Sequence, residues 1–551
     1  MEQFSHLQRS SIIQKLESTN YDLIIIGGGI TGAGIALDAA SRGMKTALVE
    51  KNDFASGTSS KSTKLIHGGL RYLKQFQFRM VADVGRERKI VHKLAPHLVL
   101  PEKMLLPVLS NSTMGMFSIS IGLKIYDFLA GVKGDDRRRM LGKTKTLKAE
   151  PLIPEKNLKG SGLYAEYRTD DARLTIELIK SAFQYGADCL NYMEVKDLSY
   201  DNKEINGIVC HDHHDGKTVS IKGKYIINAA GPWVDDLRKI NNSKKGIHLF
   251  LSKGIHLVVD WKKLPVQHSI YFEIEDGRML FLIPRDQSTY FGTTDTPYSD
   301  DKDIINIDFK DVKYLVSAIN SMFPAVELKI EDIKSSWAGL RPLIYEEGKS
   351  ASEISRKDEI FTSSTGLISI AGGKLTGYRK MAVKIVNLVN NKINKKYNKK
   401  YGNSETLKIP LCGNSFTNYN DVTVYIDKIS NSLKKLEIST DYASYLVHNY
   451  GIQTDSIIKN ISGSGRSNGE LDLLRSELDH CINFEMVYKP LDFLERRTGR
   501  LYFWSDSIGN CVSEILTVFK NNFNWTDKKY KIEEKILIDK MSQIRNFTDS
   551  K

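Results

Sequence analysis

The stretch at residues 21–50, YDLIIIGGGITGAGIALDAASRGMKTALVE, decides the fold of this chain. It begins with an apolar, β-branched run at 21–26 and continues with a glycine-rich turn, a helical segment at 34–42 and a second strand at 46–50. A strand, helix and strand in this order are typical of a buried parallel βαβ unit. The sequence therefore predicts an α/β domain near the start of the chain.

The glycines of this turn have the spacing of a dinucleotide site. Gly27, Gly29 and Gly32 form GxGxxG between the strand and the helix, and Glu50 ends the next strand. Such glycines permit a tight turn and close approach to a pyrophosphate, the helix N-terminus attracts that anion, and the acidic residue can bind a ribose hydroxyl. The unit alone leaves FAD and NAD open. We find no second strand, GxGxxG and helix set for a nicotinamide, which favours FAD.

Length and composition limit the class of protein. The 551 residues predict two to four domains, and 41% hydrophobic with 26% charged residues excludes disordered and fibrous chains. The longest apolar stretch, 114–132, is interrupted by Lys124 and Asp127, so we expect no membrane span. The N-terminal residues lack the pattern of a secretory signal, and we expect a cytoplasmic protein.

Cysteine usage and charge restrict the chemistry. The five cysteines are scattered and never form CxxC, so we expect neither a disulfide framework nor a metal site, and redox chemistry would need a cofactor. The net charge of +13 could attract nucleic acid, anionic lipid or an anionic substrate. A lysine-rich solvated surface explains the same charge.

The predicted secondary structure changes twice along the rest of the chain. Residues 255–260, 278–284 and 289–293 are strand-like, and RDQS joins the last two as in a hairpin, which predicts an antiparallel sheet. A helix at 384–400 ends in a lysine-rich, acid-free stretch where we place a domain boundary. Apolar residues at helical spacing beyond it predict a mainly α C-terminal region.

The segment GTSSKSTKLIHGGLRY, residues 57–72, is a candidate functional loop. Gly68 and Gly69 would let backbone lie against a flat ring, and Arg71 and Tyr72 offer donors to a phosphate or hydroxyl. His67 is a candidate functional residue because of this motif, although a single histidine is more often a core or surface residue.

A second anion-friendly turn occurs in GLISIAGGKLTGYR, residues 366–379, where Lys374 opens a helix. Beside a flavin, such a terminus and cation would stabilise negative charge near N1 and C2=O of the reduced ring. Arg341 in WAGLRPL and Arg356 in ISRKD add cations. Each alone could be a surface residue, but together they suggest a site for a dianionic phosphate.

The sequence resembles the flavin-dependent glycerol-3-phosphate dehydrogenases of bacteria, particularly the Gram-positive form. The motifs that carry the resemblance include GGGITGAGIALDAASRG, SSKSTKLIHGGLRYLKQF, NAAGPWVDDL, KGIHLVV, FGTTDT, SSWAGLRPL, SEISRKDEI and AGGKLTGYRKMA. The resemblance runs from about residue 21 to 379, is weaker over 391–488 and resumes at PLDFLERRTGRLYF, residues 490–503.

The resemblance implies an α/β fold with three parts. We expect a discontinuous Rossmann-type FAD-binding domain of the D-amino-acid-oxidase type at 1–90, 160–245 and 345–400. An α+β substrate-binding domain with an antiparallel sheet is expected at 91–159 and 246–344. A C-terminal, mainly helical cap is expected at 401–551.

The resemblance also implies a reaction and its partners. It implies oxidation of sn-glycerol 3-phosphate to dihydroxyacetone phosphate in glycerol catabolism, with hydride passing from C2 to N5 of FAD and electrons leaving to membrane quinone, menaquinone or ubiquinone. The protein would attach peripherally to the anionic inner face of the cell membrane. Relatives of this kind often form homodimers, although no residue of this chain indicates one.

Site residues follow from matching motif positions. The expected substrate-binding residues are Arg71, Tyr72, Thr294, Arg341, Arg356 and Lys374. Of these, Arg341 and Lys374 would lie near the reacting carbinol, and the general base would be His67 or His256. The expected FAD-binding residues are Gly27, Gly29, Gly32, Glu50, Thr58, Ser59, Ser60, Gly68, Gly69, Gly231, Gly372, Gly373, Lys374, Leu375 and Thr376.

Two other functions remain alternatives. A glycerol-3-phosphate oxidase would share the fold but pass electrons to oxygen and release hydrogen peroxide; members of that subfamily carry an additional flexible insert, and we see none here. A nucleic-acid-binding flavoprotein would explain the charge, but no basic stripe with interleaved aromatics and no known nucleic-acid motif is present, so we expect no nucleic-acid partner.

Overall fold

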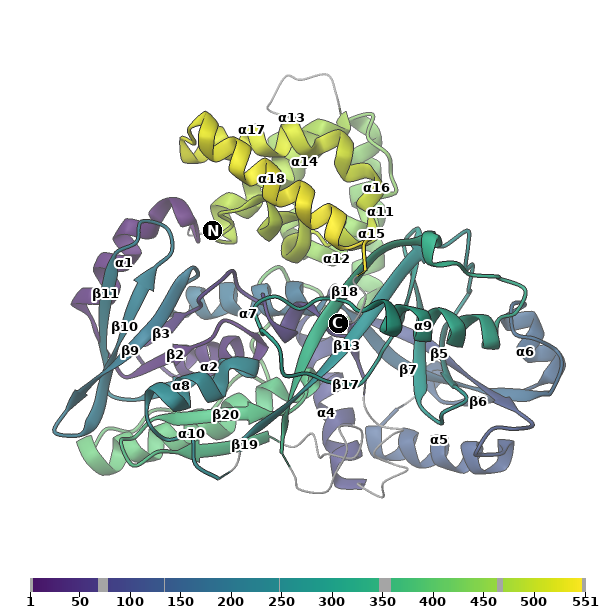
Figure 1. Ribbon diagram of the computed structural model, residues 1–551, viewed down its shortest axis with the longest axis horizontal. Coiled ribbons are helices and arrows are strands. Elements are labelled where there is room, and N and C mark those ends of the chain that lie inside the picture. Colours follow the sequence, from purple (N-terminus) through teal and green to yellow (C-terminus); the bar gives the residue numbers. More distant parts are fainter. Residues whose placement is uncertain are drawn as a thin grey trace.

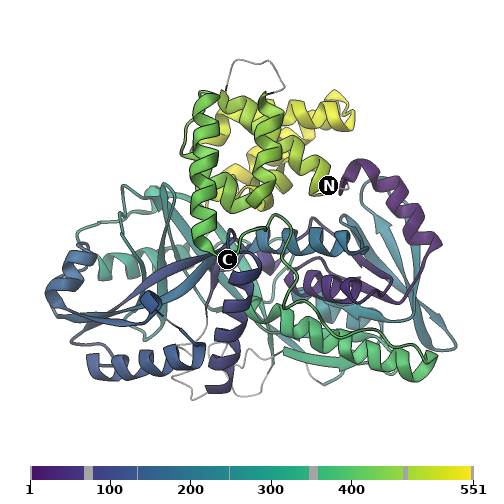
Figure 2. The ribbon, with the colours of Figure 1, turned by 180° about the vertical axis from the view of Figure 1, so that it is seen from behind.

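The computed structural model describes residues 3–67, 78–132, 134–246, 248–345, 358–462 and 469–547. Two parts that contain the sheets lie side by side, and a helical part formed by the end of the chain sits across them (Figure 1). Figure 2 shows the same arrangement from behind. This architecture confirms the predicted fold class.

The predicted βαβ unit is present at the N-terminal end. Strands β2 (Leu23–Ile26) and β3 (Thr46–Val49) pair in parallel and are buried along their whole length. Helix α2 joins them as Ile30–Ser41 and therefore begins four residues before the predicted start at residue 34. The prediction was short because glycines are poor helix formers, whereas Gly32 is required inside this helix: a Cβ there would lie 1.9 Å from the Gly27 carbonyl oxygen.

Around this unit a central parallel sheet forms in the order β19-β20-β12-β2-β3-β8, with only β19 antiparallel among the described strands. Helix α2 packs against α7 and α10 on this sheet. A small sheet, β1-β11-β10-β9, lies beside it and is contacted by α1. The bounds are α1 (Arg9–Ser18), β1 (Asn20–Tyr21), α7 (Asp171–Gln184), β8 (Asp188–Leu190), β9 (Met193–Asp201), β10 (Glu204–Asp212), β11 (Thr218–Gly223), β12 (Ile226–Asn228), α8 (Val234–Ile240), β19 (Asp358–Thr362), β20 (Ile368–Gly372) and α10 (Tyr378–Tyr397).

The middle of the chain forms a large, mostly antiparallel sheet in the order β17-β13-β16-β15-β14-β5-β7-β4, with β18 on β13 and β6 on β7. The hairpin predicted around RDQS is β15–β16. The expected boundary at residue 160 falls inside β7, which pairs with β5 in this sheet. The bounds are β4 (Leu65–Ile66), α4 (Phe78–Leu94), β5 (Val99–Leu109), α5 (Met116–Ala130), β6 (Arg139–Gly142), α6 (Lys143–Ala149), β7 (Leu158–Thr169), β13 (Leu249–Asp260), β14 (Ser269–Glu273), β15 (Met279–Arg285), β16 (Ser288–Gly292), β17 (Thr296–Pro297), α9 (Phe309–Met322) and β18 (Ile333–Ile344).

The C-terminal region is mainly helical in its described residues, as predicted, with irregular structure at 401–418. The lysine-rich stretch is not a free linker, because α10 continues to Tyr397 and ends at Asn398 in the left-handed conformation. Apolar side chains of the following helices form one core with residues of the large sheet. The bounds are α11 (Tyr419–Lys435), α12 (Tyr442–Tyr450), α13 (Thr454–Ser462), α14 (Gly469–Phe484), the π-helix η8 (Asp492–Arg497), α15 (Arg500–Phe503), α16 (Ser505–Ile508), α17 (Val512–Phe523) and α18 (Asp527–Gln543).

Within the described ranges, we find no helix with the length and apolar character needed to cross a bilayer.

Candidate active site

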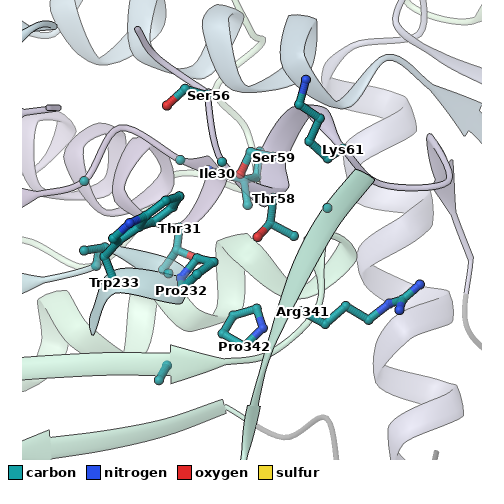
Figure 3. A pocket seen from close by; sticks show the side chains of 18 of the residues that line it. Ile30, Thr31, Ser56, Thr58, Ser59, Lys61, Pro232, Trp233, Arg341 and Pro342 are labelled. Carbon is teal, nitrogen blue, oxygen red and sulfur yellow. Dashed lines mark hydrogen bonds between the residues drawn. The ribbon is translucent and has the colours of Figure 1, made fainter. Parts of the chain in front are cut away.

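A cavity of about 460 Å³ lies between the central parallel sheet and the large sheet. Its walls combine the glycine turn after β2, the segment 56–67, the turn after β12, part of β18 and the turn after β20. Figure 3 shows Trp233 and Arg341 on opposite sides of this space. The predicted motifs, which are hundreds of residues apart, therefore meet at one place.

The dinucleotide end of the cavity contains Gly27, Gly29 and Glu50. Gly27 has φ +115°, and a Cβ on it would lie 2.6 Å from the Ala229 carbonyl oxygen, so this turn requires glycine. The Glu50 carboxylate accepts hydrogen bonds from the N–H groups of Gly28 at 2.7 Å and Asn52 at 2.9 Å. Burial raises the pKa of Glu50 and these two donors oppose that rise. Glu50 is thus held as a fixed acceptor.

Segment 57–63 connects the glycine turn to the large sheet. Ser59 Oγ accepts the N–H of Ile30 at 2.9 Å, and Thr58 Oγ1 donates to the Leu340 carbonyl on β18 at 2.6 Å. Both residues line the cavity. The predicted cofactor residues Gly32 and Ser60 do not line it: Gly32 packs under the turn, and buried Ser60 bonds back to the carbonyl of Gly57.

The opposite wall carries two further glycine turns. Gly231, Gly372 and Gly373 have φ of 55°, 75° and 82°, which are conformations that glycine adopts readily. Lys374 follows and begins the turn that leads into α10. The predicted residues that line the cavity from these turns are Gly231, Gly372, Gly373, Lys374, Leu375 and Thr376.

Arg341 is held at the other end of the cavity by the loop after β16. Its guanidinium donates to the Thr294 carbonyl at 3.0 Å, to Asp295 Oδ1 at 3.2 Å and to Thr293 Oγ1 at 2.9 Å. The group lies over Gly254, because a Cβ on that glycine would be 2.3 Å from a guanidinium nitrogen. Several donors in a fixed plane suit an anionic substrate.

The Thr294 side chain does not line the cavity, although the sequence predicted a substrate contact. Its hydroxyl accepts the N–H of Ile255 at 3.2 Å and donates to the Lys253 carbonyl. Thr294 therefore supports Arg341 through its backbone carbonyl.

His256 is buried on β13 and lines the cavity. Its Nε2 forms a hydrogen bond with Thr63 Oγ1 at 2.9 Å, and its ring stacks on Trp337 with centroids 4.9 Å apart. Burial, followed by the charges of Arg341 and Lys64, holds the pKa of His256 well below its usual range. The imidazole is therefore neutral at neutral pH.

His67 also lines the cavity, and its ring meets the edge of Phe281 at 4.7 Å. The remaining predicted site residues lie outside the described residues; they are Gly68, Gly69, Arg71, Tyr72 and Arg356.

The structure adds cavity residues that the sequence reasoning missed. Lys61 and Thr63 belong to the GTSSKSTK segment, and Trp233 belongs to NAAGPW. Membership of these motifs was the sequence signal that could have identified them. Lys61 forms an ion pair with Glu495 and a hydrogen bond to Tyr502, both from the C-terminal region. Asp303 reaches the cavity from a loop without any motif, and no sequence signal could have found it.

These residues fit FAD. The turn after β2 can pack tightly only because Gly27 and Gly32 lack a Cβ, and a tight glycine turn of this kind lets a pyrophosphate approach the backbone. Glu50 supplies an acceptor for ribose, and the N-terminus of α2 supplies N–H groups. The cavity continues from there to Lys374, His256 and Arg341, as a ligand with a nucleotide at one end and a reactive ring at the other requires.

Comparison with known proteins also indicates an FAD-binding protein. Residues 22–379 match the family model for FAD dependent oxidoreductases, and residues 404–530 match the C-terminal domain of alpha-glycerophosphate oxidase. The chain is 47% identical over 530 residues to an aerobic glycerol-3-phosphate dehydrogenase of Bacillus subtilis, covering 96% of this chain and 95% of that protein. It is 49% identical over 522 residues to the Staphylococcus aureus (strain USA300) protein of the same name, covering 93% and 94%.

A solved structure is similar over both complete chains. The glycerol-3-phosphate dehydrogenase from Bacillus halodurans, determined in complex with FAD, is 39% identical, covers 100% of each chain and has a TM-score of 0.84. These matches confirm the resemblance and the FAD-binding fold predicted from the sequence. The chain belongs to the aerobic glycerol-3-phosphate dehydrogenases, a family of FAD-dependent oxidoreductases.

Proposed function

We propose that this protein oxidises sn-glycerol 3-phosphate to dihydroxyacetone phosphate in glycerol catabolism and passes the electrons to a membrane quinone. FAD, when bound, supplies the hydride acceptor, N5. The observation that carries the proposal is Arg341, held flat over Gly254 by the loop after β16, in the same cavity as the glycine turn and His256.

Cations at both walls suit an anionic alcohol. We assign Arg341 and Lys374 to the substrate near the carbinol, where a positive charge stabilises the alkoxide that forms as the hydroxyl loses its proton. Asp295 balances part of the Arg341 charge at 3.2 Å and restricts the motion of its guanidinium. Arg71, Tyr72 and Arg356 remain proposed substrate-binding residues on the basis of the resemblance.

We assign the general base to His256, with His67 as the alternative. His256 is oriented by two contacts, the hydrogen bond to Thr63 and the stack on Trp337, and its lowered pKa keeps the imidazole unprotonated at neutral pH, which is the state that a base requires. The packing of His67 against Phe281 provides one ring contact. Binding energy from the remote phosphate would orient C2, so glycerol itself should react very poorly.

Helix α5 supports peripheral attachment to an anionic membrane surface. Phe117 and Phe128 are 79% and 84% exposed, and Ile121 and Ile125 are exposed between them on the same helix face. Exposed aromatic side chains at this spacing suit a helix that lies in the lipid interface. Attachment of this kind would bring the flavoprotein to its quinone.

Basic residues adjoin this face. Lys124 is exposed on α5, and the run at 137–139 is RRR. Helix α10 carries Lys392, Lys395 and Lys396 of the lysine-rich stretch. Both views place α5 and α10 on the side of the molecule away from the C-terminal helices (Figures 1 and 2). The lysine cluster would add attraction to anionic lipid.

A glycerol-3-phosphate oxidase is the second candidate, favoured by the match of residues 404–530 to a domain described from alpha-glycerophosphate oxidase. The test is anaerobic reduction of the purified protein with glycerol 3-phosphate, after which the reduced sample is divided between oxygen and a soluble quinone. We expect bleaching of the flavin band, fast reoxidation by quinone and slow reoxidation by oxygen. Fast formation of hydrogen peroxide would establish the oxidase. If the flavin band does not bleach, glycerol 3-phosphate is not the substrate.

A further inference from the structure

A loop of the large-sheet part crosses to the part that holds the dinucleotide end of the cavity. We call residues 300–308 the strap; they lie between β17 and α9. Asp303 Oδ1 of the strap lies 2.5 Å from Lys51 Nζ, and Lys302 forms an ion pair with Asp236 of α8. Each side thus contributes one lysine and one aspartate, so the two ion pairs are reciprocal.

The ion pairs lie at the cavity. Asp303, Asp236, Lys51 and Trp233 all line it. Lys51 follows Glu50, the acceptor expected to bind ribose, and its ammonium lies 4.4 Å from the centre of a Trp233 ring. The strap therefore closes the cavity at the end where the adenosine half of a dinucleotide belongs.

The ends of the strap are anchored independently of these pairs. Tyr298, just before it, donates its N–H to the Leu251 carbonyl at 2.9 Å, and its hydroxyl donates to the Asp301 carbonyl at 2.6 Å. At the other end, Asp308 forms an ion pair with Lys253 of β13. The anchors belong to the large-sheet part, whereas the ion pairs of Lys302 and Asp303 join the middle of the strap to the opposite side.

Solvent reaches both pairs. The side chains of Asp303 and Asp236 are 52% and 40% exposed, and those of Lys51 and Lys302 are 24% and 22% exposed. Ion pairs of this exposure are weak and are screened by salt. They suit a contact that opens for cofactor loading better than a permanent structural bond.

We propose that the strap retains FAD: the reciprocal ion pairs Lys51–Asp303 and Lys302–Asp236 close the cavity over the adenosine end of the cofactor and slow its release. The proposal rests on FAD binding by this family and is independent of which acceptor or substrate the enzyme uses. No bond of the cofactor changes, and the strap acts on the rate of release only.

The test measures FAD dissociation from the purified holoenzyme, followed by the rise in fluorescence of released flavin after dilution. For the unaltered protein we expect release to accelerate several-fold between about 0.02 M and about 0.5 M NaCl, over which the screening length falls from roughly 20 Å to roughly 4 Å. Asp303→Asn should release FAD roughly 3- to 10-fold faster at low salt, as expected for a weak ion pair, and should respond less to salt.

Charge reversal separates pairing from a general disturbance of the loop. Asp303→Lys should release FAD faster still, since it repels Lys51, and the double change Lys51→Asp with Asp303→Lys should recover slow release. The matched control is Asp455→Asn, which removes the exposed Lys428–Asp455 ion pair of the C-terminal helices and should leave release unchanged.

The proposal is overturned if Asp303→Asn and Asp236→Asn both release FAD at the unaltered rate, or if the double change releases it no more slowly than Asp303→Lys. Equal acceleration by Asp455→Asn would also overturn it. Release is measured without turnover, so failure of the proposed reaction and failure of the strap give distinguishable results.

Discussion

Arg497 donates two hydrogen bonds to the carboxylate of Asp53, at 2.8 Å and 2.9 Å, with both side chains fully buried. Arg496 adds a third at 2.6 Å. Burial alone would raise the pKa of Asp53, but Arg497 and Arg496 outweigh it and lower the pKa to about 2. This contact ties the π-helix η8 to the loop after β3, so the C-terminal helices are joined to the dinucleotide-binding part through charge.

Removing the Asp53 charge should strongly destabilise the protein. Asp53→Asn removes the carboxylate that Arg497 bonds with both of its terminal nitrogens and one of the three carboxylates around Arg496. We expect a loss of about 3–5 kcal/mol in the free energy of unfolding, measured by urea unfolding and circular dichroism. The control Asp455→Asn breaks an exposed ion pair and should cost no more than about 0.5 kcal/mol. A loss below about 1 kcal/mol for Asp53→Asn would contradict the assigned role.

The N-terminal helix should loosen in mild acid because of His6. Its ring stacks on Tyr488 at 4.0 Å, and burial, Arg9 and His214 hold the pKa of His6 well below its usual range. The unfolded state therefore binds a proton near pH 6.5 that the folded state binds only at lower pH, so stability falls as the pH drops below about 6.5. Hydrogen exchange should be faster in residues 6–18 at pH 5.5 than at pH 7.5, after correction for intrinsic exchange. His6→Phe keeps the stack and should reduce that difference; an unchanged difference would assign the effect to another group.

Gly254→Ala should impair catalysis without unfolding the protein. The added Cβ would meet the end of the Arg341 side chain and the Thr293 hydroxyl, both of which can move. We expect kcat/KM for glycerol 3-phosphate to fall about 10- to 100-fold, or about 1.4–2.7 kcal/mol, with little change in Tm. Gly402→Ala, at a glycine with open space around it, is the matched control and should keep full activity. Full activity in Gly254→Ala would show that the position of Arg341 is not critical.

The two candidate bases can be distinguished by the rate of anaerobic flavin reduction. His256→Asn should lower this rate by about 10²- to 10⁴-fold with a smaller change in substrate affinity, whereas His67→Asn should have a lesser effect. Because the pKa of His256 is lowered, the acid limb of the pH profile should lie below about 6.5 in the unaltered enzyme. The reverse order of effects would assign the base to His67.

Replacing the aromatic residues of α5 should weaken membrane attachment. Phe117→Ser with Phe128→Ser removes two side chains that are 79% and 84% exposed, so folding should be unaffected while sedimentation with anionic phospholipid vesicles falls at least about 10-fold. Val424→Ser changes a 69% exposed side chain on α11 and serves as the control. Equal sedimentation of all three proteins would place the membrane contact elsewhere.

Local sequence patterns determined much of this protein. The alternation of buried strand, glycine turn and helix at residues 21–50, the hairpin around RDQS and the helical C-terminal region were all predictable, because backbone periodicity and turn chemistry depend on neighbouring residues. The motifs also supplied predicted site residues that line the cavity, including Gly27, Glu50, Arg341 and Lys374.

The tertiary structure decided what depends on residues far apart in the chain. The sequence by itself determined that Thr294 belongs to a motif, but only packing turned its hydroxyl to the backbone of β13 and its carbonyl to Arg341. Only packing brought Arg497 to Asp53 and Asp303 to Lys51. Such pairs leave no pattern in the local sequence, because their two residues come from elements that are far apart in the chain. The free energy of each contact depends on the burial of its charges, and that burial exists only in the assembled fold.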